Sequence, residues 1–176
     1  VNPGKIICVG RNYVEHAKEH NVEVPEVPIL FLKPTSSIIG PGEHILLPPQ
    51  SKQVEHEAEL AVVIGRKGKW ISIADAMNYV FGFTIANDVT ARDIQRKDGQ
   101  WTRGKGFDTF CPIGPWIETD LDVADTLISC RVNQEMRQMS STREMVFTVE
   151  QLISFASSVM TLHPGDVILT GTPAGV

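Results

Sequence analysis

The sequence predicts a β-rich α+β fold made of a single domain. Short apolar runs rich in β-branched residues recur along the chain, and such runs are typical of strands. Helix start signals are fewer, and the strands do not alternate regularly with helices, which argues against a doubly wound parallel sheet. With 176 residues, of which 42% are hydrophobic, the chain is long enough for one well-buried core and short for two.

The apolar runs predict six strands. We expect them at residues 5–10, 29–33, 57–65, 80–87, 127–132 and 167–170. Before the last of these, Pro164-Gly165-Asp166 is a turn signal. The eleven prolines and fourteen glycines are spread along the chain, as expected for residues in turns, and do not cluster into a linker. We therefore expect one continuous domain over residues 1–176.

Two helices carry capping signals. One should start at Ser72, where Ser-Ile-Ala-Asp resembles the opening of a capping box before ADAMNYV. The other should start at Thr148, where Thr-Val-Glu-Gln precedes LISFASSVM.

Charge and hydropathy exclude several kinds of partner. The net charge is −5 and the sequence pI is about 5.5, whereas a nucleic-acid partner calls for a clustered basic surface. No apolar run approaches the ~20 residues needed to span a bilayer, and the amino end lacks the pattern of a secretory signal. We therefore expect a cytoplasmic protein with no nucleic-acid and no membrane partner.

The cysteines suggest neither a disulfide framework nor a thiolate zinc site. Cys8, Cys111 and Cys130 are odd in number, widely separated and never arranged as CxxC. We expect them to be buried small hydrophobes. We interpret the three tryptophans, Trp70, Trp101 and Trp116, as packing residues.

Three carboxylates are the strongest chemical signal. Glu57 and Glu59 are two residues apart at the start of a predicted strand, so their side chains project from the same face. Asp88 follows the next predicted strand and can come from a neighbouring one. Oxygen ligands without cysteine favour Mg²⁺ or Mn²⁺, with Ca²⁺ as a further option, over Zn²⁺. The alternative is that these acids, together with Glu55 on the same face, form the solvated surface of an edge strand.

A second group of polar residues lies in NYVEHAKEH. His16 and Glu19 are spaced i, i+3 and share one helix face, so the carboxylate can orient the imidazole and raise its basicity as a general base. Two alternatives stay open. The segment can be an ordinary exposed polar helix or loop, or His16 and His20 can form an i, i+4 zinc pair, although the HExxH order is absent.

The order of motifs resembles one known family. GRNYVEHAKEH, LFLKP, HEAELAVVIGR, NDVTARD, GKGFDTFCPIGPW and LTGTPAGV follow one another as in the fumarylacetoacetate hydrolase family, over nearly the whole chain. The resemblance is closest to short members that act as acylpyruvate hydrolases or oxaloacetate decarboxylases. It implies a mixed β-sandwich roll with a few short helices, and a homodimer. Because such members continue into further strands after the Gly-Thr-Pro element, we expect this chain to lack C-terminal strands of the domain.

The resemblance also implies roles for individual residues. It makes Glu57, Glu59 and Asp88 the metal ligands, and His16 with Glu19 a catalytic pair on a short helix that closes over the substrate. Lys105, between two glycines in RGKGFDTF, becomes the catalytic lysine, which offsets the excess negative charge of three carboxylates around one divalent ion. Considered alone, Lys105 would be an ordinary surface lysine.

Four further residues are predicted to contact the substrate. Arg92 and Gln95 of TARDIQ are candidates to hold its distal part, although Arg92 can instead pair internally with Asp93 or Asp88. By resemblance, Thr172 of the Gly-Thr-Pro element binds the substrate carboxylate. Tyr13 is carried over in the same way, although such an aromatic is more often a core or lid residue.

The function implied is divalent-metal-dependent cleavage of a carbon–carbon bond in a small 2,4-dioxo or 2-oxo dicarboxylic acid. The reaction would be acylpyruvate or fumarylpyruvate hydrolysis, or oxaloacetate decarboxylation, through an enolate stabilised by the metal. One alternative is the 2-hydroxyhepta-2,4-diene-1,7-dioate isomerase/decarboxylase activity of aromatic catabolism, because those members share most of the motifs. An alternative of another class is a non-catalytic module that binds a metal or an oxo acid.

Overall fold

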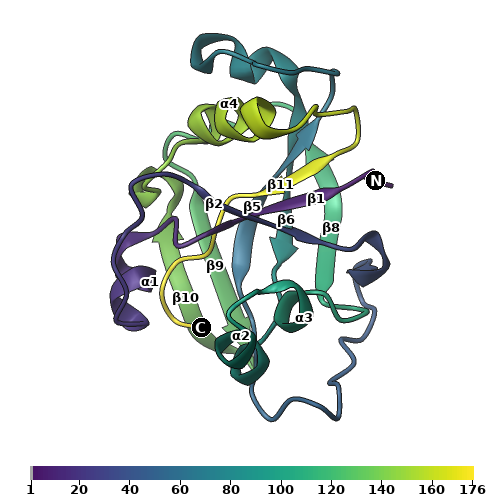
Figure 1. Ribbon diagram of the computed structural model, residues 1–176, viewed down its shortest axis with the longest axis vertical. Coiled ribbons are helices and arrows are strands. Elements are labelled where there is room, and N and C mark those ends of the chain that lie inside the picture. The colour runs from purple at the N-terminus through teal and green to yellow at the C-terminus, as the bar shows by residue number, and fades with distance from the viewer. Residues whose placement is uncertain (1) are drawn as a thin grey trace.

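The computed structural model describes residues 2–176, and a curled seven-stranded sheet dominates it (Figure 1). Its strands, in chain order, are β1 (Ile6–Gly10), β2 (Ile29–Lys33), β3 (Ile38–Ile39), β5 (Ala58–Ile64), β6 (Val80–Asn87), β8 (Cys111–Glu118) and β11 (Val167–Leu169). They lie in the order β2-β1-β11-β5-β6-β8-β3. The pairs β1/β11 and β3/β8 are parallel and the other pairs are antiparallel.

Two small two-stranded sheets accompany the main one. β4 (Val54–Glu55) pairs with β7 (Thr90–Ala91), and β9 (Leu127–Val132) pairs with β10 (Glu135–Ser141). β9 also packs near β5, so the β9–β10 ribbon faces the main sheet (Figure 1). This arrangement confirms the predicted β-rich α+β class and its mixed β-sandwich roll.

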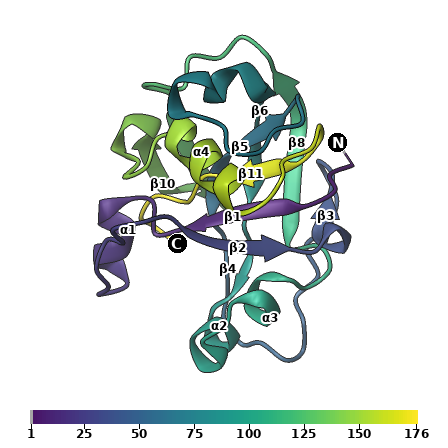
Figure 2. The same cartoon turned by 45° about the horizontal axis from the view of Figure 1, so that its top comes forward.

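The helices are short and lie around the sheet. They are α1 (Val14–Glu19), α2 (Arg92–Asp98), α3 (Thr102–Lys105) and α4 (Val149–Val159), with 3-10 segments η1 (Thr35–Ser37), η2 (Ile73–Tyr79) and η3 (Thr142–Glu144). α2 and α3 lie together below β2, whereas α4 and η2 cover the opposite end of the molecule (Figure 2).

The predicted strands and one predicted helix are confirmed. All six strands are present with ends within one residue of those expected. The capping box at Thr148 is complete, because the Thr148 hydroxyl accepts from the Gln151 N–H and the Gln151 side chain accepts from the Thr148 N–H. Ser72 caps Asp75 as predicted, but the segment that follows is 3-10 and not α-helical. A short segment of this kind can adopt the tighter winding without a long ladder of i→i−4 bonds.

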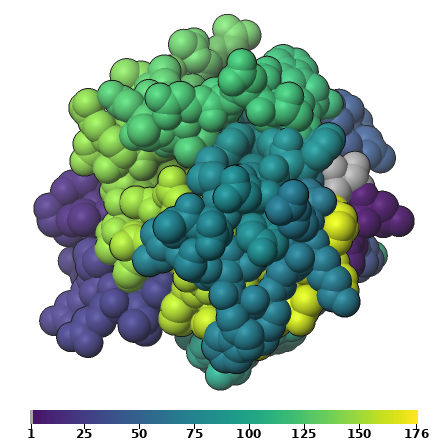
Figure 3. All heavy atoms as spheres, turned by 90° about the horizontal axis from the view of Figure 1, so that it is seen from above, coloured from purple at the N-terminus to yellow at the C-terminus, as the bar shows by residue number. Residues whose placement is uncertain are grey.

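The largest core cluster lies between the sheet and the pair α4–η2. Apolar side chains of the central strands, such as Leu60, Val62 and Ile168, pack against Leu152 and Ile153 of α4. Seen from above, segments near residue 75 lie across those near residue 155 (Figure 3). A second cluster on the opposite face of the sheet includes Cys8 and Cys111. This packing holds β5 and β6 rigidly side by side.

The prediction for the cysteines is confirmed for Cys8 and Cys111, which are fully buried, while Cys130 is only partly buried. The prediction for the tryptophans is wrong at two positions. Trp70 and Trp116 are 72% and 71% exposed. Trp70 has a positive φ of 57° that turns it out of the chain path, and Trp116 lies on a face of β8 that nothing in the described chain covers. No helix within residues 2–176 is long and apolar enough to cross a membrane.

Candidate active site

Three buried carboxylates meet where β5 begins and β6 ends. Glu57 immediately precedes β5, Glu59 lies within it, and Asp88 follows β6. The antiparallel register pairs Ala58 with Asn87, and the Asp88 N–H donates to the Glu57 carbonyl at 2.9 Å. The three residues are at most 4% exposed, and one carboxylate oxygen of each lies within 4.8 Å of the others. The predicted convergence is confirmed, and the alternative of a solvated edge strand is wrong.

Two buried lysines bind this carboxylate group. The Lys105 ammonium, on the last residue of α3, donates to Glu57 Oε2 at 2.7 Å and to Asp88 Oδ2 at 2.6 Å. From the end of β2, Lys33 donates to Asp88 Oδ1 at 2.6 Å and to the Val89 carbonyl at 3.2 Å. Lys105 is therefore not the ordinary surface lysine that its local sequence alone suggests. The sequence prediction missed Lys33, and the available signal was a lysine ending the apolar run ILFLK.

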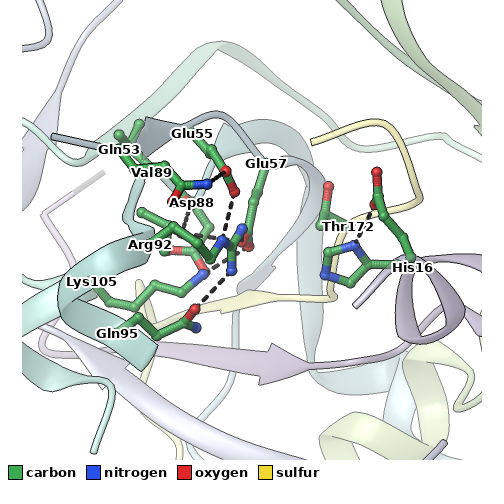
Figure 4. Close-up of polar contacts among 12 residues, drawn as sticks. His16, Gln53, Glu55, Glu57, Asp88, Val89, Arg92, Gln95, Lys105 and Thr172 are labelled. Atoms are coloured by element: carbon green, nitrogen blue, oxygen red, sulfur yellow. Dashed lines mark hydrogen bonds and ion pairs between the residues drawn. The ribbon is translucent and has the colours of Figure 1, made fainter. Parts of the chain in front are cut away.

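Arg92, at the start of α2, connects the carboxylate group to Glu55. Its guanidinium donates to Glu57 Oε1 at 2.5 Å, to Glu55 Oε2 at 2.6 Å and to Gln95 Oε1 at 2.8 Å (Figure 4). The predicted pairing of Arg92 with Asp93 or Asp88 is absent from the contacts of the described residues. Three of its five N–H donors are used, so two stay available for a ligand.

The charge balance differs sharply between Glu57 and Glu59. Burial alone would raise the pKa of Glu57, but the Lys105 and Arg92 cations outweigh it and hold the pKa well below its ordinary value. Burial raises the pKa of Glu59 well above its ordinary value, and the neighbouring Asp88 and Glu57 carboxylates raise it further. Among the described residues Glu59 has no cationic partner in contact, and its Oε2 accepts only the Gly171 N–H, at 2.7 Å. The site thus lacks positive charge beside Glu59.

These residues fit a hard divalent cation. Glu57, Glu59 and Asp88 offer only oxygen donors, which Mg²⁺, Mn²⁺ and Ca²⁺ prefer. A cation beside them would supply the charge that Glu59 lacks. The lysine contacts do not exhaust the site, because each carboxylate oxygen has a second lone pair.

His16 and Glu19 face the same site from α1. The His16 ring is buried, and its Nδ1 lies 3.4 Å from Glu19 Oε2. Burial lowers the pKa of His16, and the opposing influence of Glu57 and Glu19 does not restore it, so the ring is neutral at pH 7. Both oxygens of Glu19 lie 3.2 Å from the Gly175 N–H, which connects α1 to the last turn of the described chain. The predicted pair is therefore formed in space, on a short helix as expected.

A cavity of about 490 Å³ connects these groups. His16 and Thr172 line one side of it, while Arg92 and Gln95 line the other, with Glu57 between them (Figure 4). Glu19 also lines the cavity, whereas Lys105, Glu59 and Asp88 do not. Two residues that the sequence prediction missed, Arg11 and Arg96, also line the cavity, so its walls carry three guanidinium groups.

Thr172 and Tyr13, the remaining residues predicted to contact the substrate, differ in position, because Thr172 lines the cavity and Tyr13 does not. Thr172 is buried, donates from its hydroxyl to the Ala58 carbonyl at 2.9 Å, and accepts from Gln138 Nε2 at 2.7 Å. Tyr13 is 2% exposed and does not line the cavity, and its hydroxyl finds no hydrogen-bond partner in the described chain. Burial, with the nearby Glu59 charge, raises the pKa of Tyr13. The substrate contacts of Tyr13, Thr172, Arg92 and Gln95 stay predictions.

Known proteins match this chain over its whole length. It is 58% identical to an uncharacterised protein of Methanocaldococcus jannaschii, covering 100% of this chain and 74% of that protein. It is 56% identical to the mitochondrial oxaloacetate tautomerase Fahd2a of Rattus norvegicus, covering 99% of this chain but only 57% of that protein. The chain thus spans less than two thirds of this mitochondrial relative.

Solved structures of similar proteins have the same fold as this chain. The 5-carboxymethyl-2-hydroxymuconate delta-isomerase of Mycobacterium smegmatis superposes with a TM-score of 0.93 at 52% identity, covering 99% of this chain and 70% of that one. The 2-hydroxyhepta-2,4-diene-1,7-dioate isomerase of Mycobacterium marinum gives 0.92 at 48% identity, covering 99% and 66%. The model of the fumarylacetoacetate hydrolase C-terminal domain matches residues 5–176. The chain therefore belongs to the fumarylacetoacetate hydrolase family.

Proposed function

We propose that this protein is a divalent-metal-dependent enzyme that acts on a small 2-oxo dicarboxylic acid, with oxaloacetate as the first candidate, by moving a proton at the carbon next to the oxo group. The observation that carries the proposal is the meeting of two groups at one cavity. A buried carboxylate cluster, in which Glu59 has no cationic contact within residues 2–176, reaches the cavity through Glu57, and the neutral His16 with Glu19 lies at the cavity wall. The names of the relatives, an oxaloacetate tautomerase and two isomerases, support proton transfer.

The chain's own residues have distinct tasks. His16 Nδ1 faces Glu19, which leaves Nε2 as the nitrogen that takes a proton from the substrate carbon and returns it. Glu19 fixes the ring orientation and stabilises the imidazolium that forms. Lys105 keeps Glu57 ionised, donates to Asp88, and stabilises negative charge that develops on the substrate oxygen. A cation held by Glu57, Glu59 and Asp88 supplies Lewis acidity toward the oxygens of the oxo acid.

The cavity wall supports a substrate with two carboxylates. Arg11, Arg92 and Arg96 bring three positive charges to a space of about 490 Å³. Since Arg92 still has two free N–H donors, it can hold one carboxylate while the Gln95 side-chain NH₂ donates to the rest of the molecule.

Cleavage of a carbon–carbon bond, as predicted from the sequence, is the second candidate. Loss of CO₂ from oxaloacetate, or attack of a water activated by His16 on an acylpyruvate, leaves the same enolate beside Lys105. The same residues therefore serve both reactions, and the observation that favours cleavage is the motif order described above.

The test is an assay of the purified protein with Mg²⁺ or Mn²⁺. Enol–keto conversion of oxaloacetate, pyruvate release from oxaloacetate and cleavage of an acylpyruvate are followed separately. We expect activity in at least one assay, its loss with chelator, and a fall in kcat of about 10²–10⁴ in His16→Asn, the usual contribution of a general base. The matched control is His163→Asn, at an exposed histidine outside the cavity.

Two results would contradict the proposal. One is full activity in chelator. The other is a metal-loaded protein that is inert toward all three substrates and toward unsaturated oxo-diacids, which would favour the non-catalytic binding module.

A further inference from the structure

A second group of metal-ligating side chains lies on α1 and its C-cap residue His20, apart from the carboxylate cluster. His16, Glu19 and His20 each offer a donor atom, and these atoms lie within 4.8 Å of one another. The spacings i, i+3 and i+4 put all three on one helix face. The two imidazole rings are in contact, with centroids 4.7 Å apart at an angle of 83°.

His20 has an unmet hydrogen-bonding capacity. Its Nε2 is buried, yet it has no hydrogen-bond partner within residues 2–176. The His16–Glu19 contact is long, at 3.4 Å, so its atoms can rearrange at little cost. In the described chain, Lys18 pairs with Glu15 at 2.6 Å and not with Glu19.

From these contacts we propose that His16, Glu19 and His20 form a binding site for a borderline transition-metal ion of the Zn²⁺ class, and that an ion bound there inhibits the enzyme. Two imidazoles and one carboxylate are a common zinc ligand set, with a fourth position for water. Four ligands at about 2.1 Å in a tetrahedron lie roughly 3.4 Å apart, so side-chain rotation suffices to close the group.

The two metal sites differ in ligand chemistry. The carboxylate cluster contains only oxygen donors and suits hard cations, whereas imidazole nitrogen favours zinc, copper, nickel and cobalt. The charge around the α1 group also permits a cation. The guanidinium of Arg92, which acts electrostatically on both histidines, is matched by Glu55 and Glu57, and Glu19 adds a negative charge of its own. Excess Mg²⁺ should therefore fill one site and leave the other for Zn²⁺.

Inhibition follows from the position of His16. An ion that takes a ring nitrogen and the Glu19 carboxylate removes the base and the group that orients it. It also sits at the wall of the cavity, which all three residues line. This inhibitory consequence rests on the proposed function, whereas binding of the ion does not.

The binding test uses Co²⁺ and Zn²⁺ with the full chain in excess Mg²⁺. We expect one Co²⁺ per chain with visible absorption bands of a low-coordinate histidine site, displaced by Zn²⁺. His20→Asn should weaken Zn²⁺ binding at least 10-fold and abolish the bands. His44→Asn, at an exposed histidine remote from the cavity, should change neither. Glu59→Gln should keep the Co²⁺ bands, because it alters only the carboxylate cluster.

The results separate this inference from the proposed function. Unchanged Zn²⁺ affinity in His20→Asn, or loss of the Co²⁺ bands in Glu59→Gln, would overturn the α1 site even if the enzyme is active. Where an activity is measured, Zn²⁺ inhibition should shift to at least 10-fold higher concentration in His20→Asn, relative to that variant's own activity. An inert protein that still shows the His20-dependent bands supports the site and contradicts the proposed function alone.

Discussion

Glu59 is the carboxylate of the site whose negative charge is least compensated by neighbouring cations. It is 1% exposed and lacks a cationic contact in the described chain, whereas Glu57 and Asp88 share Lys105, and Asp88 also binds Lys33. Its raised pKa means that the folded state binds the proton more tightly than the unfolded state does. Without metal, stability therefore falls as the pH rises above the ordinary glutamate value, until the folded pKa is passed.

Glu59→Gln should stabilise the metal-free protein at neutral pH. Glutamine needs neither a bound proton nor a buried charge at this position, so we expect a gain of about 1–3 kcal/mol, the usual cost of an unsatisfied buried group. The gain should shrink below the ordinary glutamate pKa, because both states are then protonated. Chemical unfolding in chelator across pH measures it, with the exposed Glu23→Gln as control. A loss of stability at neutral pH would show that the charge is compensated.

Lys33 should contribute to the stability of the fold by compensating the charge of Asp88. Lys33→Met leaves Asp88 with one ammonium partner in place of two, and breaking a buried pair costs about 3 kcal/mol or more. Lys18→Met removes an exposed pair with Glu15 and should cost less than about 1 kcal/mol. The free energies of unfolding of the two variants give the comparison. Equal effects would mean that Lys33 is not needed to neutralise Asp88.

At the residue scale the sequence predicted the acids but not their partners. Glu57, Glu59 and Asp88 could be predicted because the first two share one face of a strand and the third follows the next apolar run. Lys33 could not be predicted, because the burial of a lysine depends on how β2 packs over the end of β6. The three-way contact of Arg92 likewise needs the bend between β4 and β5, which places Glu55 beside α2.

At the scale of elements, Asn12 connects three segments. Its amide donates to the Thr170 carbonyl at 2.7 Å and to the Phe147 carbonyl at 3.0 Å, and its oxygen accepts the Phe147 N–H at 2.7 Å. The residue is fully buried between the end of β1 and the start of α1. It therefore sets where α1 leaves the sheet, and with it the position of His16.

Asn12→Ala should destabilise the fold and loosen α1. It leaves the buried Thr170 carbonyl without a partner, at about 1–3 kcal/mol, and two partly buried backbone groups of Phe147 that water can reach in part. We expect a loss of about 2–4 kcal/mol in thermal or chemical unfolding, with faster amide exchange in α1. Asn78→Ala, at an exposed position of η2, is the control. Unchanged exchange in α1 would show that Asn12 does not anchor this helix.

Helices and strands could be predicted where their local sequence pattern is strong. β5 is an apolar run buried along its whole length, and α4 starts at a full capping box, so local signals suffice. β8 was missed because CPIGPWIE contains two prolines, which usually argue against a strand, and β10 because EMRQMSS is mostly polar. β3, β4 and β7 have two residues each and carry no period.

At the scale of the whole molecule, divalent metal should stabilise the fold. Binding to the folded state alone adds about 2.7 kcal/mol at a metal concentration of 100 Kd. For a chain of this size that corresponds to a rise in Tm of roughly 5–10 °C. Thermal unfolding with Mg²⁺ or Mn²⁺, against chelator, measures it, and Glu57→Ala should abolish the shift. An equal shift in Glu57→Ala would place the bound ion elsewhere.

The order of the strands in the sheet could not be predicted from the sequence. Local patterns predict strands, but neighbours such as β1 and β11 are joined by pairings far apart in the chain, and no short-range signal specifies them. The predicted homodimer stays a prediction that the mass from sedimentation equilibrium can decide, and the predicted loss of C-terminal strands also stays a prediction.

The place of β11 has a consequence for how the protein is made. Val167 to Leu169 lie between β1 and β5, near the middle of the sheet, although they are among the last residues of the described chain to be synthesised. Until they leave the ribosome, β1 and β5 have no shared neighbour and their apolar faces stay open. A nascent chain must therefore wait for its late residues before the sheet can close, which makes chaperone protection most useful during that interval.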